Sequence, residues 1–253
     1  MKLRLHQFLA RAGVAKNNFE INQMIKKGRV RVDKDVVTAE SFIFDTKTRR
    51  VYLDGEEIKL QATRYFLINK PKGHSCQRGE YPNVSDLLEN ILRNEPKAMR
   101  SIFVVGRLDR DTEGLLILTN DGRMASNILQ PVENVEKEYE ALIDGILTEK
   151  EVEKLESGVT ITVDNEDYLT APSKVEVKKR VKIPSTGKST TLVRIIVTEG
   201  KKRQVRQMFE AVLHPVISLK RVRIGSLKLE DMEDKWVKEM TRFEISKALS
   251  NMD

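Results

Sequence analysis

The sequence predicts an α+β protein with two domains. Residues 1–59 read as two short amphipathic helices followed by small hairpins, and residues 60–64 read as a linker. From residue 65 onward, apolar runs with the length and composition of buried strands alternate with short helices. A chain of 253 residues has room for two modest domains. We therefore expect domains at 1–59 and 65–253.

Apolar spacing indicates the first helix. Apolar residues recur at i, i+3, i+4 and i+7, and a glycine follows where a C-terminal cap is expected. These positions are Leu5, Phe8, Leu9, Ala12 and Gly13. A second helix is expected to begin at Asn17 or Asn18 and to end at Gly28. Its buried face is predicted to hold Phe19, Ile21, Met24 and Ile25.

The remaining elements follow from the same patterns. Hairpins are expected at 30–37 and at 51–58, the second around Asp54-Gly55. Strands are expected at 65–69, 102–105, 115–118, 137–143, 159–163, 174–178 and 190–197. Helices are expected at 84–92, after Asn120-Asp121-Gly122 as far as Pro131, from the Thr148 capping box to Gly158, and after Gly200.

Charge points to a polyanionic partner. The chain carries a net charge of +7, and residues 1–60 hold thirteen Lys and Arg against eight Asp and Glu, which is +5 of that total. This is the footprint of a nucleic-acid-binding module, in which phosphate contacts position the protein without reading sequence. The expected RNA-binding residues are Arg4, Arg11, Lys16, Lys26, Lys27, Arg29 and Arg31.

Several classes of protein are disfavoured. No run approaches the length of a membrane span, and the N-terminus has neither an apolar core nor a cleavage site, so we expect a cytoplasmic protein with no membrane partner. The single cysteine, Cys76, excludes an internal disulfide framework and a cysteine-based zinc site. The three histidines are scattered, so we expect no metal.

The loop from Arg107 to Glu113 is the expected seat of chemistry. It lies between two apolar runs and contains two arginines and three carboxylates. Asp109 is flanked by Arg107 and Arg110, and nearby positive charge favours the ionised form that nucleophilic or base chemistry requires. A salt-bridged turn without chemistry is the plain alternative. Asp109 and Asp111 could also serve a glycosidase or hold a metal, although no His or Cys lies nearby.

Other side chains could complete such a site. Tyr139 would offer a ring to stack on a base and a hydroxyl for proton transfer, or would simply be a core tyrosine. Arg203 and Arg206 lie three apart on one helix, where they could bind phosphate or pair with a carboxylate such as Asp109. Lys70 ends a strand and could meet a phosphate. We expect Lys70, Arg107 and Arg203 to bind substrate.

Four motifs in order resemble those of the RsuA/RluA-type pseudouridine synthases, and their spacing and the domain order are similar to the RsuA/RluB-type branch. They are Asn69-Lys70-Pro71-x-Gly73, Gly106-Arg107-Leu108-Asp109-x-x-Thr112-x-Gly114-Leu115-Leu116, Lys137-x-Tyr139-x-Ala141 and Glu199-Gly200-x-x-Arg203-Gln204-Val205-Arg206-x-Met208. Residues 1–59 resemble the S4-type RNA-binding domain, although Lys16-Asn17-Asn18 is poorer in Arg than the usual basic pair.

The resemblance implies a catalytic domain built on a mixed, mostly antiparallel sheet with a central cleft. It implies that Asp109 is the essential carboxylate and that Tyr139 stacks on the uracil and helps to remove the C5 proton. It also implies that Arg206 holds Asp109 as an ion pair. No cofactor and no metal are implied, and the target uridine is expected to flip into the cleft.

The expected reaction is conversion of a uridine to pseudouridine in small-subunit (16S) ribosomal RNA, within a subunit-assembly intermediate and by a monomer. Residues 65–71 and 167–172 favour this target because they are similar to the RsuA-like branch. Alternatives are the same reaction on large-subunit (23S) RNA and a non-catalytic RNA-binding assembly factor. A glycosidic-bond hydrolase that uses Asp109 and Asp111 is a third.

Overall fold

The computed structural model describes residues 1–129, 135–182, 187, 189–232 and 235–250, which form two compact units. The first unit contains Met1–Arg64, Ser85–Phe103 and Leu118–Asp121. The second contains Tyr65–Val84, Val104–Ile117 and Gly122–Asp253. Pro131, predicted to end a helix, lies outside the described residues.

The first unit begins with the two predicted helices, α1 (Leu5–Ala12) and α2 (Asn18–Lys26). Gly13 caps α1 in the left-handed conformation, and the side chain of Asn17 accepts a hydrogen bond from the Glu20 amide at the start of α2. Both helices bury apolar residues against β2 and β5 in one core. The helix predictions for this region are therefore confirmed.

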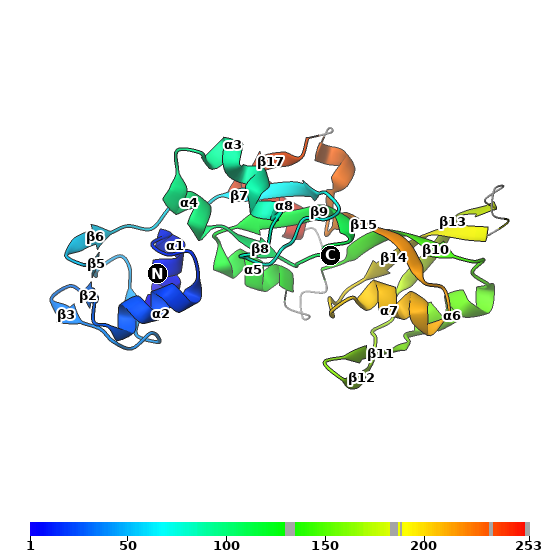
Figure 1. Ribbon diagram of the computed structural model, residues 1–253, viewed down its shortest axis with the longest axis horizontal. Coiled ribbons are helices and arrows are strands. Elements are labelled where there is room, and N and C mark those ends of the chain that lie inside the picture. The colour runs from blue at the N-terminus through cyan, green and yellow to red at the C-terminus, as the bar shows by residue number, and fades with distance from the viewer. Residues whose placement is uncertain (130–134, 183–186, 188, 233–234, 251–253) are drawn as a thin grey trace. The chain divides into compact units, whose positions relative to one another are not determined.

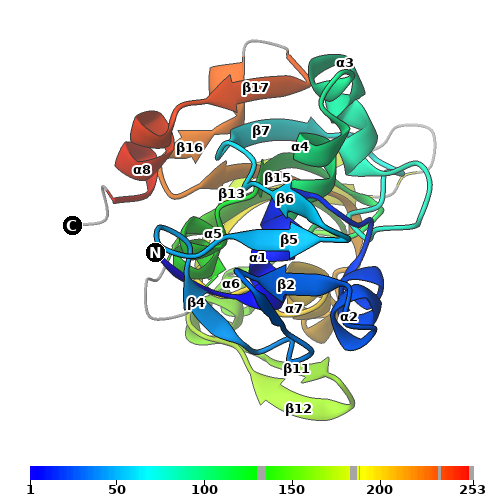
Figure 2. The same cartoon turned by 90° about the vertical axis from the view of Figure 1, so that its left-hand side faces the viewer.

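Six short strands accompany these helices, and their arrangement can be followed in Figures 1 and 2. A four-stranded sheet has the order β3-β2-β5-β6, and β1 pairs separately with β4. Both predicted hairpins are present, because β2 pairs with β3 and β5 pairs with β6, each antiparallel. The strands are β1 (Lys2–Arg4), β2 (Val30–Val32), β3 (Asp35–Val36), β4 (Ile43–Asp45), β5 (Val51–Leu53) and β6 (Glu56–Ile58).

Phe19 contradicts its prediction as a buried residue, because it is 71% exposed. The buried positions of α2 are Ile21 and Ile25. Phe19 precedes Ile21 by two residues, which places it about 200° away around the helix. Its apolar character alone was therefore misleading, and the spacing of four between Ile21 and Ile25 was the better guide.

The first unit also takes in segments that the sequence assigned to the second domain. These contain most of η1 (Val84–Leu88), together with α3 (Glu89–Leu92) and α4 (Pro96–Ser101). Nε of Arg100, at the end of α4, donates to the Gly13 carbonyl over 2.7 Å. The amide nitrogen of Asn120 donates to the Ala62 carbonyl over 2.8 Å, and its oxygen accepts from the Arg64 amide. Residues 60–64 are thus bonded to the first unit.

The second unit is built on a nine-stranded sheet whose main path is β13-β14-β10-β15-β9-β7-β17. The pairings of β10 with β14 and β15, of β13 with β14 and of β17 with β7 are antiparallel, whereas β15 and β9 run parallel. The predicted mixed, mostly antiparallel sheet is confirmed. Its strands are β7 (Tyr65–Lys70), β8 (Phe103–Val105), β9 (Thr112–Thr119), β10 (Lys137–Asp144), β13 (Lys174–Lys182), β14 (Ser189–Val197), β15 (Val216–Ile224), β16 (Leu227–Lys228) and β17 (Val237–Met240).

Helices α6 (Glu149–Ser157) and α7 (Gln204–Ala211) share a hydrophobic core with β10 and β14. Tyr139, Ala141 and Ile143 contribute to this core from alternate positions of β10, as predicted. The capping box at Thr148 is also confirmed. The remaining elements are α5 (Gly122–Leu129), η3 (Leu229–Met232), α8 (Arg242–Ser250) and a hairpin of β11 (Thr160–Val163) with β12 (Glu166–Leu169), whose second strand was not predicted. No helix in the described part of the chain is long and apolar enough to span a membrane.

Gly114 lets β9 approach β15 closely, and Gly114→Ala is expected to lower the free energy of unfolding by roughly 2–3 kcal/mol. The residue has φ 102°, and an added Cβ would lie 2.2 Å from the Arg221 carbonyl oxygen. That oxygen belongs to the paired strand, so relief of the clash requires the strands to separate. Chemical denaturation measures the change.

Gly122→Ala is the matched control. Gly122 is the first residue of α5, and an added Cβ there meets no atom within 4 Å. We expect a change in the free energy of unfolding below about 1 kcal/mol. Equal stability of the two variants would contradict the close approach at Gly114.

Candidate active site

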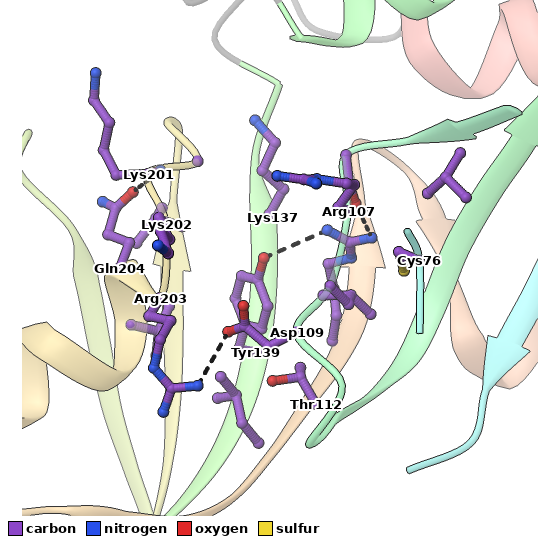
Figure 3. Close-up of a pocket in the computed structure, with 18 of the residues that line it drawn as sticks. Cys76, Arg107, Asp109, Thr112, Lys137, Tyr139, Lys201, Lys202, Arg203 and Gln204 are labelled. Atoms are coloured by element: carbon purple, nitrogen blue, oxygen red, sulfur yellow. Dashed lines mark hydrogen bonds and ion pairs between the residues drawn. The ribbon is translucent and has the colours of Figure 1, made fainter. Parts of the chain in front are cut away.

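A cleft of about 730 Å³ lies in the second unit, where the loop between β8 and β9 faces β10, β15 and the start of α7 (Figure 3). Asp109, Tyr139, Arg107 and Arg203 all line it, so the structure brings four of the predicted site residues together. Asp109 lies in a short loop whose ends are set by two paired strands, and its carbonyl accepts a hydrogen bond from the Thr112 amide. The fold therefore presents this carboxylate on a constrained turn.

Arg203 is the cation that faces Asp109. Its guanidinium lies 3.9 Å from the Asp109 carboxylate (Figure 3). It lies 3.6 Å from the carboxylate of Asp111. Arg203 is the N-cap of α7 and has φ 53°, a backbone region that side chains other than glycine rarely adopt. Such local strain is found disproportionately at functional sites, and here it accompanies the placement of a positive charge beside two carboxylates.

Arg206 does not pair with Asp109, contrary to the prediction. Its Nη2 lies 3.1 Å from the Asp111 carboxylate and donates to the Asp111 carbonyl and to the Thr112 hydroxyl. Its Nη1 donates to the Val216 carbonyl. Arg206 lies almost one helical turn beyond Arg203, so it reaches the base of the loop while Arg203 reaches the side that faces the cleft. It therefore anchors the loop that carries Asp109.

Lys70 also differs from its prediction as a substrate-binding residue. It is 0% exposed, and its ammonium donates to the carbonyls of Pro71, Arg110 and Thr112. Burial lowers the pKa of this lysine. The reason for its position is that β7 lies beside β9, which brings the end of β7 under the loop. Lys70 and Arg206 therefore both donate to the backbone of residues 110–112.

Tyr139 projects from β10 into the same cleft as Asp109 (Figure 3). Its hydroxyl accepts a long hydrogen bond of 3.5 Å from Nη1 of Arg221. Arg107 is exposed at the rim of the cleft, where its guanidinium can meet a phosphate. The arrangement offers a carboxylate, an aromatic ring and several cations to a bound nucleotide.

Lys137, Tyr168 and Arg221 line the cleft as well, although the sequence did not predict them as site residues. Tyr168 donates to the Glu199 carboxylate over 2.7 Å, and the Lys201 ammonium lies 4.3 Å from the centroid of its ring. Lys137 shares a motif with Tyr139, and Tyr168 lies within the segment 167–172 that resembles the RsuA-like branch, so both had a sequence signal. Arg221 had none, because β15 reaches the cleft only through tertiary folding.

Cys76 lies in the wall of the cleft. Burial raises the pKa of its thiol, so it is a poor nucleophile at neutral pH. No group of three or more His, Cys, Asp or Glu side chains within the described ranges is arranged to hold a metal ion. The carboxylates that line the cleft are those of Asp109, Glu80 and Glu199, and Glu80 and Glu199 accept hydrogen bonds from Ser75 and Tyr168.

The seven basic residues predicted to bind RNA lie in the first unit, and all except Arg11 are exposed. Several have partners within the unit. Arg29 pairs with Asp54, Lys26 lies 4.0 Å from Glu40, and the Arg31 guanidinium lies over the Tyr52 ring. Arg11 donates to the Met1 sulfur over 3.8 Å. Lys27 and Arg4 are open to solvent on this surface.

The lowered pKa of Lys137 leads us to expect that RNA binding depends on pH. It is 8% exposed, and burial together with the charge of Arg221 lowers its pKa to about 8. Its positive charge is therefore lost as the pH rises from 7 to 9, and the cleft then attracts phosphate less strongly. We expect KM for RNA to rise about threefold to fivefold over this range. Steady-state kinetics measure it.

The control variants separate Lys137 from other groups. At pH 7 the Lys137→Met variant should have a higher KM than the parent protein. Because the titrating group is gone, its KM should change little between pH 7 and pH 9. Lys202→Met removes another cation of the cleft and should retain the pH dependence. The same pH profile in Lys137→Met as in the parent protein would refute the assignment.

Comparison with known proteins identifies both parts of the chain. Residues 64–211 match the family model described as RNA pseudouridylate synthase, and residues 3–49 match the S4 domain. The first match contains Asp109, Tyr139, Arg203 and Arg206. The second contains all seven basic residues predicted to bind RNA.

Similar proteins span nearly the whole chain. An uncharacterized RNA pseudouridine synthase of Aquifex aeolicus is 34% identical over 97% of this chain and 93% of its own. The Bacillus subtilis ribosomal large subunit pseudouridine synthase B is 33% identical over 99% of this chain and 97% of its own. The crystal structure of a pseudouridylate synthase superimposes with a TM-score of 0.65, 26% identity, and coverage of 97% of this chain and 99% of that one. The chain therefore belongs to the RNA pseudouridylate synthase family and carries an N-terminal S4 domain.

Proposed function

We propose that this enzyme isomerises a uridine of ribosomal RNA to pseudouridine, with Asp109 as the catalytic carboxylate. The observation that carries the proposal is the placement of Asp109 in a cleft beside Tyr139 and Arg203. The reaction breaks the N1–C1′ bond, turns the base and forms a C5–C1′ bond. The C5 proton leaves and N1 gains one, so the product is an isomer of the substrate.

Each residue has a defined part in this chemistry. Asp109 acts on the nucleotide as nucleophile or base, and the Tyr139 ring stacks on the uracil while its hydroxyl lies where a proton can be exchanged. Arg203 places positive charge beside the carboxylate. The uridine must leave its stack to reach Asp109. An incompletely folded subunit precursor supplies such a uridine at lower cost than a mature ribosome does.

Two ribosomal RNAs are candidates for the target. Large-subunit RNA is supported by the similarity, over 99% of this chain, to the Bacillus subtilis enzyme named for that subunit. Small-subunit RNA is supported by residues 65–71 and 167–172, which resemble the RsuA-like branch. Base-resolved mapping of pseudouridine after incubation of both RNAs with the enzyme distinguishes them. Free uracil or abasic sites would instead indicate a hydrolase, and binding without any product would indicate an assembly factor.

The first unit is proposed to hold ribosomal RNA through its basic surface. We expect Lys26→Gln with Lys27→Gln to weaken binding and to reduce the slope of log K against log salt by about 1 to 2, because each lost phosphate contact releases one counterion fewer. The control removes the same charge from α6 through Lys150→Gln and Lys154→Gln. Equal slopes for the two double variants would count against the basic surface.

We propose that the enzyme acts as a monomer. Light scattering of the protein with and without RNA tests this. A dimer whose dissociation abolishes activity would contradict it.

A further inference from the structure

Arg221 of β15 lies between the Asp109 loop and Tyr139 of β10 in the catalytic cleft. It is 2% exposed, and its guanidinium contacts three separate elements. Nε donates to the Leu115 carbonyl of β9 over 2.7 Å, and Nη2 donates to the Gly106 carbonyl at the start of the Asp109 loop over 2.9 Å. Nη1 makes the 3.5 Å contact with the Tyr139 hydroxyl of β10. One side chain therefore bonds both the loop and the tyrosine.

The sheet register places Arg221 between these elements. Its backbone pairs in parallel with Gly114 of β9 and in antiparallel fashion with Tyr139 of β10. The missing Cβ of Gly114 permits the close approach, since an added Cβ would lie 2.2 Å from the Arg221 carbonyl oxygen. Two strand pairings thus fix the backbone from which the guanidinium extends, unlike that of a side chain on a flexible surface loop.

The hydrogen-bond partners of Arg221 are unusual for a buried arginine. Within the described part of the chain its guanidinium bonds to carbonyl and hydroxyl oxygens and pairs with no carboxylate. Buried charges are ordinarily paired, because an isolated one is costly. Arg223, two residues along the same strand, has the ordinary arrangement and bonds to Glu138 and Glu136. A guanidinium paired with carboxylates, as in Arg223, would serve a purely structural role equally well.

We propose that Arg221 is a positioning residue, whose fork-shaped guanidinium sets the separation between the Asp109 loop and the Tyr139 hydroxyl. The inference rests on the proposed function of Asp109 and Tyr139. A planar guanidinium can donate in several directions at once, whereas a lysine ammonium at this site has the charge but not the fork. Misplacement of a catalytic group by about 1 Å lowers the rate by about 100-fold. Arg221 therefore acts on the rate of the chemical step.

The test compares Arg221→Lys with the parent protein under single turnover. We expect the rate constant to fall about 10-fold to 100-fold, with KM for RNA changed less than about threefold. Arg223→Lys is the matched control, because a register shift in the pairing with β10 puts Arg223 opposite Glu138 and Arg221 opposite Tyr139, so that the two arginines lie on opposite faces of β15. Arg223→Lys should leave the rate unchanged. A parental rate in Arg221→Lys would overturn the proposal, because the charge alone would then suffice.

A double-variant cycle tests whether Arg221 acts through Tyr139. If it does, adding Arg221→Lys to Tyr139→Phe should slow the enzyme much less than Arg221→Lys slows the parent protein. Fully additive losses would overturn the proposal. Arg221→Gln, which keeps a planar group with two donors, serves as a second variant if the lysine variant does not fold, and thermal unfolding identifies that case.

A structural measurement separates this proposal from the proposed function. If the parent protein forms no pseudouridine in either ribosomal RNA, the proposed function fails. The positioning role can still be tested, because its structural test does not depend on activity. The crystal structure of Arg221→Lys is expected to show Tyr139 and Gly106 displaced relative to Asp109. Unchanged positions of these residues would overturn the positioning role.

Discussion

Asp109→Asn is expected to lower pseudouridine formation by on the order of 10³-fold or more while RNA binding is retained. Asparagine has nearly the same shape as aspartate, but its amide is neither a nucleophile nor a base. Asp109 is one-third exposed in the cleft, so the substitution leaves no buried cavity and the fold should persist. Tritium release from C5-labelled uridine in ribosomal RNA measures the reaction, and filter binding measures the affinity.

Asp111→Asn is the matched control, two residues along the same loop. Asp111 pairs with Arg206 and Arg203, and it supports the loop. We expect a loss of about 10-fold together with a lower melting temperature, because a positioned loop is loosened rather than a reacting group removed. Full activity of Asp109→Asn would refute the assignment of Asp109 as the catalytic carboxylate. An inactive Asp111→Asn variant together with an active Asp109→Asn variant would refute it as well. Loss of activity in both with uracil release by the parent protein would indicate the hydrolase.

Arg206→Met is expected to cause the second-largest loss, on the order of 10²-fold in kcat, because it removes the anchor of the Asp109 loop. The Arg206 side chain is 6% exposed and bonds to Asp111, Thr112 and Val216. The Asp111 carboxylate is 43% exposed, so solvent screens part of the ion pair and the loss of stability should be about 1–2 kcal/mol. Steady-state kinetics and chemical denaturation measure the two effects.

Arg203→Met separates anchoring from contact with the substrate. Arg203 is 43% exposed, so its removal should change the free energy of unfolding by less than about 0.5 kcal/mol. Its loss should nevertheless reduce activity, because it faces Asp109 across the cleft. An Arg206→Met enzyme with parental stability and kcat would show that the loop needs no anchor.

Local pattern was sufficient for most elements of the fold. The helix at Leu5–Ala12 and the capping box at Thr148 each follow from residues a few positions apart. The hairpin around Asp54-Gly55 does so as well. Phe19 was wrongly predicted as a core residue because its phase on the helix was overlooked, and it faces solvent. Pattern gave less guidance where an element depends on distant partners. Residues 85–103 lie within the matched synthase region but cluster with the first unit, to which the Arg100 bond with Gly13 contributes.

The site divides in the same way. Motifs named Asp109, Tyr139 and Arg203, and the structure brings these three into one cleft. The motifs did not show that Arg206 pairs with Asp111 or that Lys70 is fully buried under the loop. They gave no sign of Arg221, whose partners come from three separate segments.

The sequence by itself determined which chemical groups this protein has and in which local elements they lie, because helix periodicity, strand alternation and caps are set by neighbouring residues. It also determined the family through the order of the four motifs. Only the tertiary structure decided which groups touch. Contacts such as Arg221 with Gly106 join residues more than a hundred positions apart, and their distances are set by strand register and close backbone approach, which no local pattern encodes.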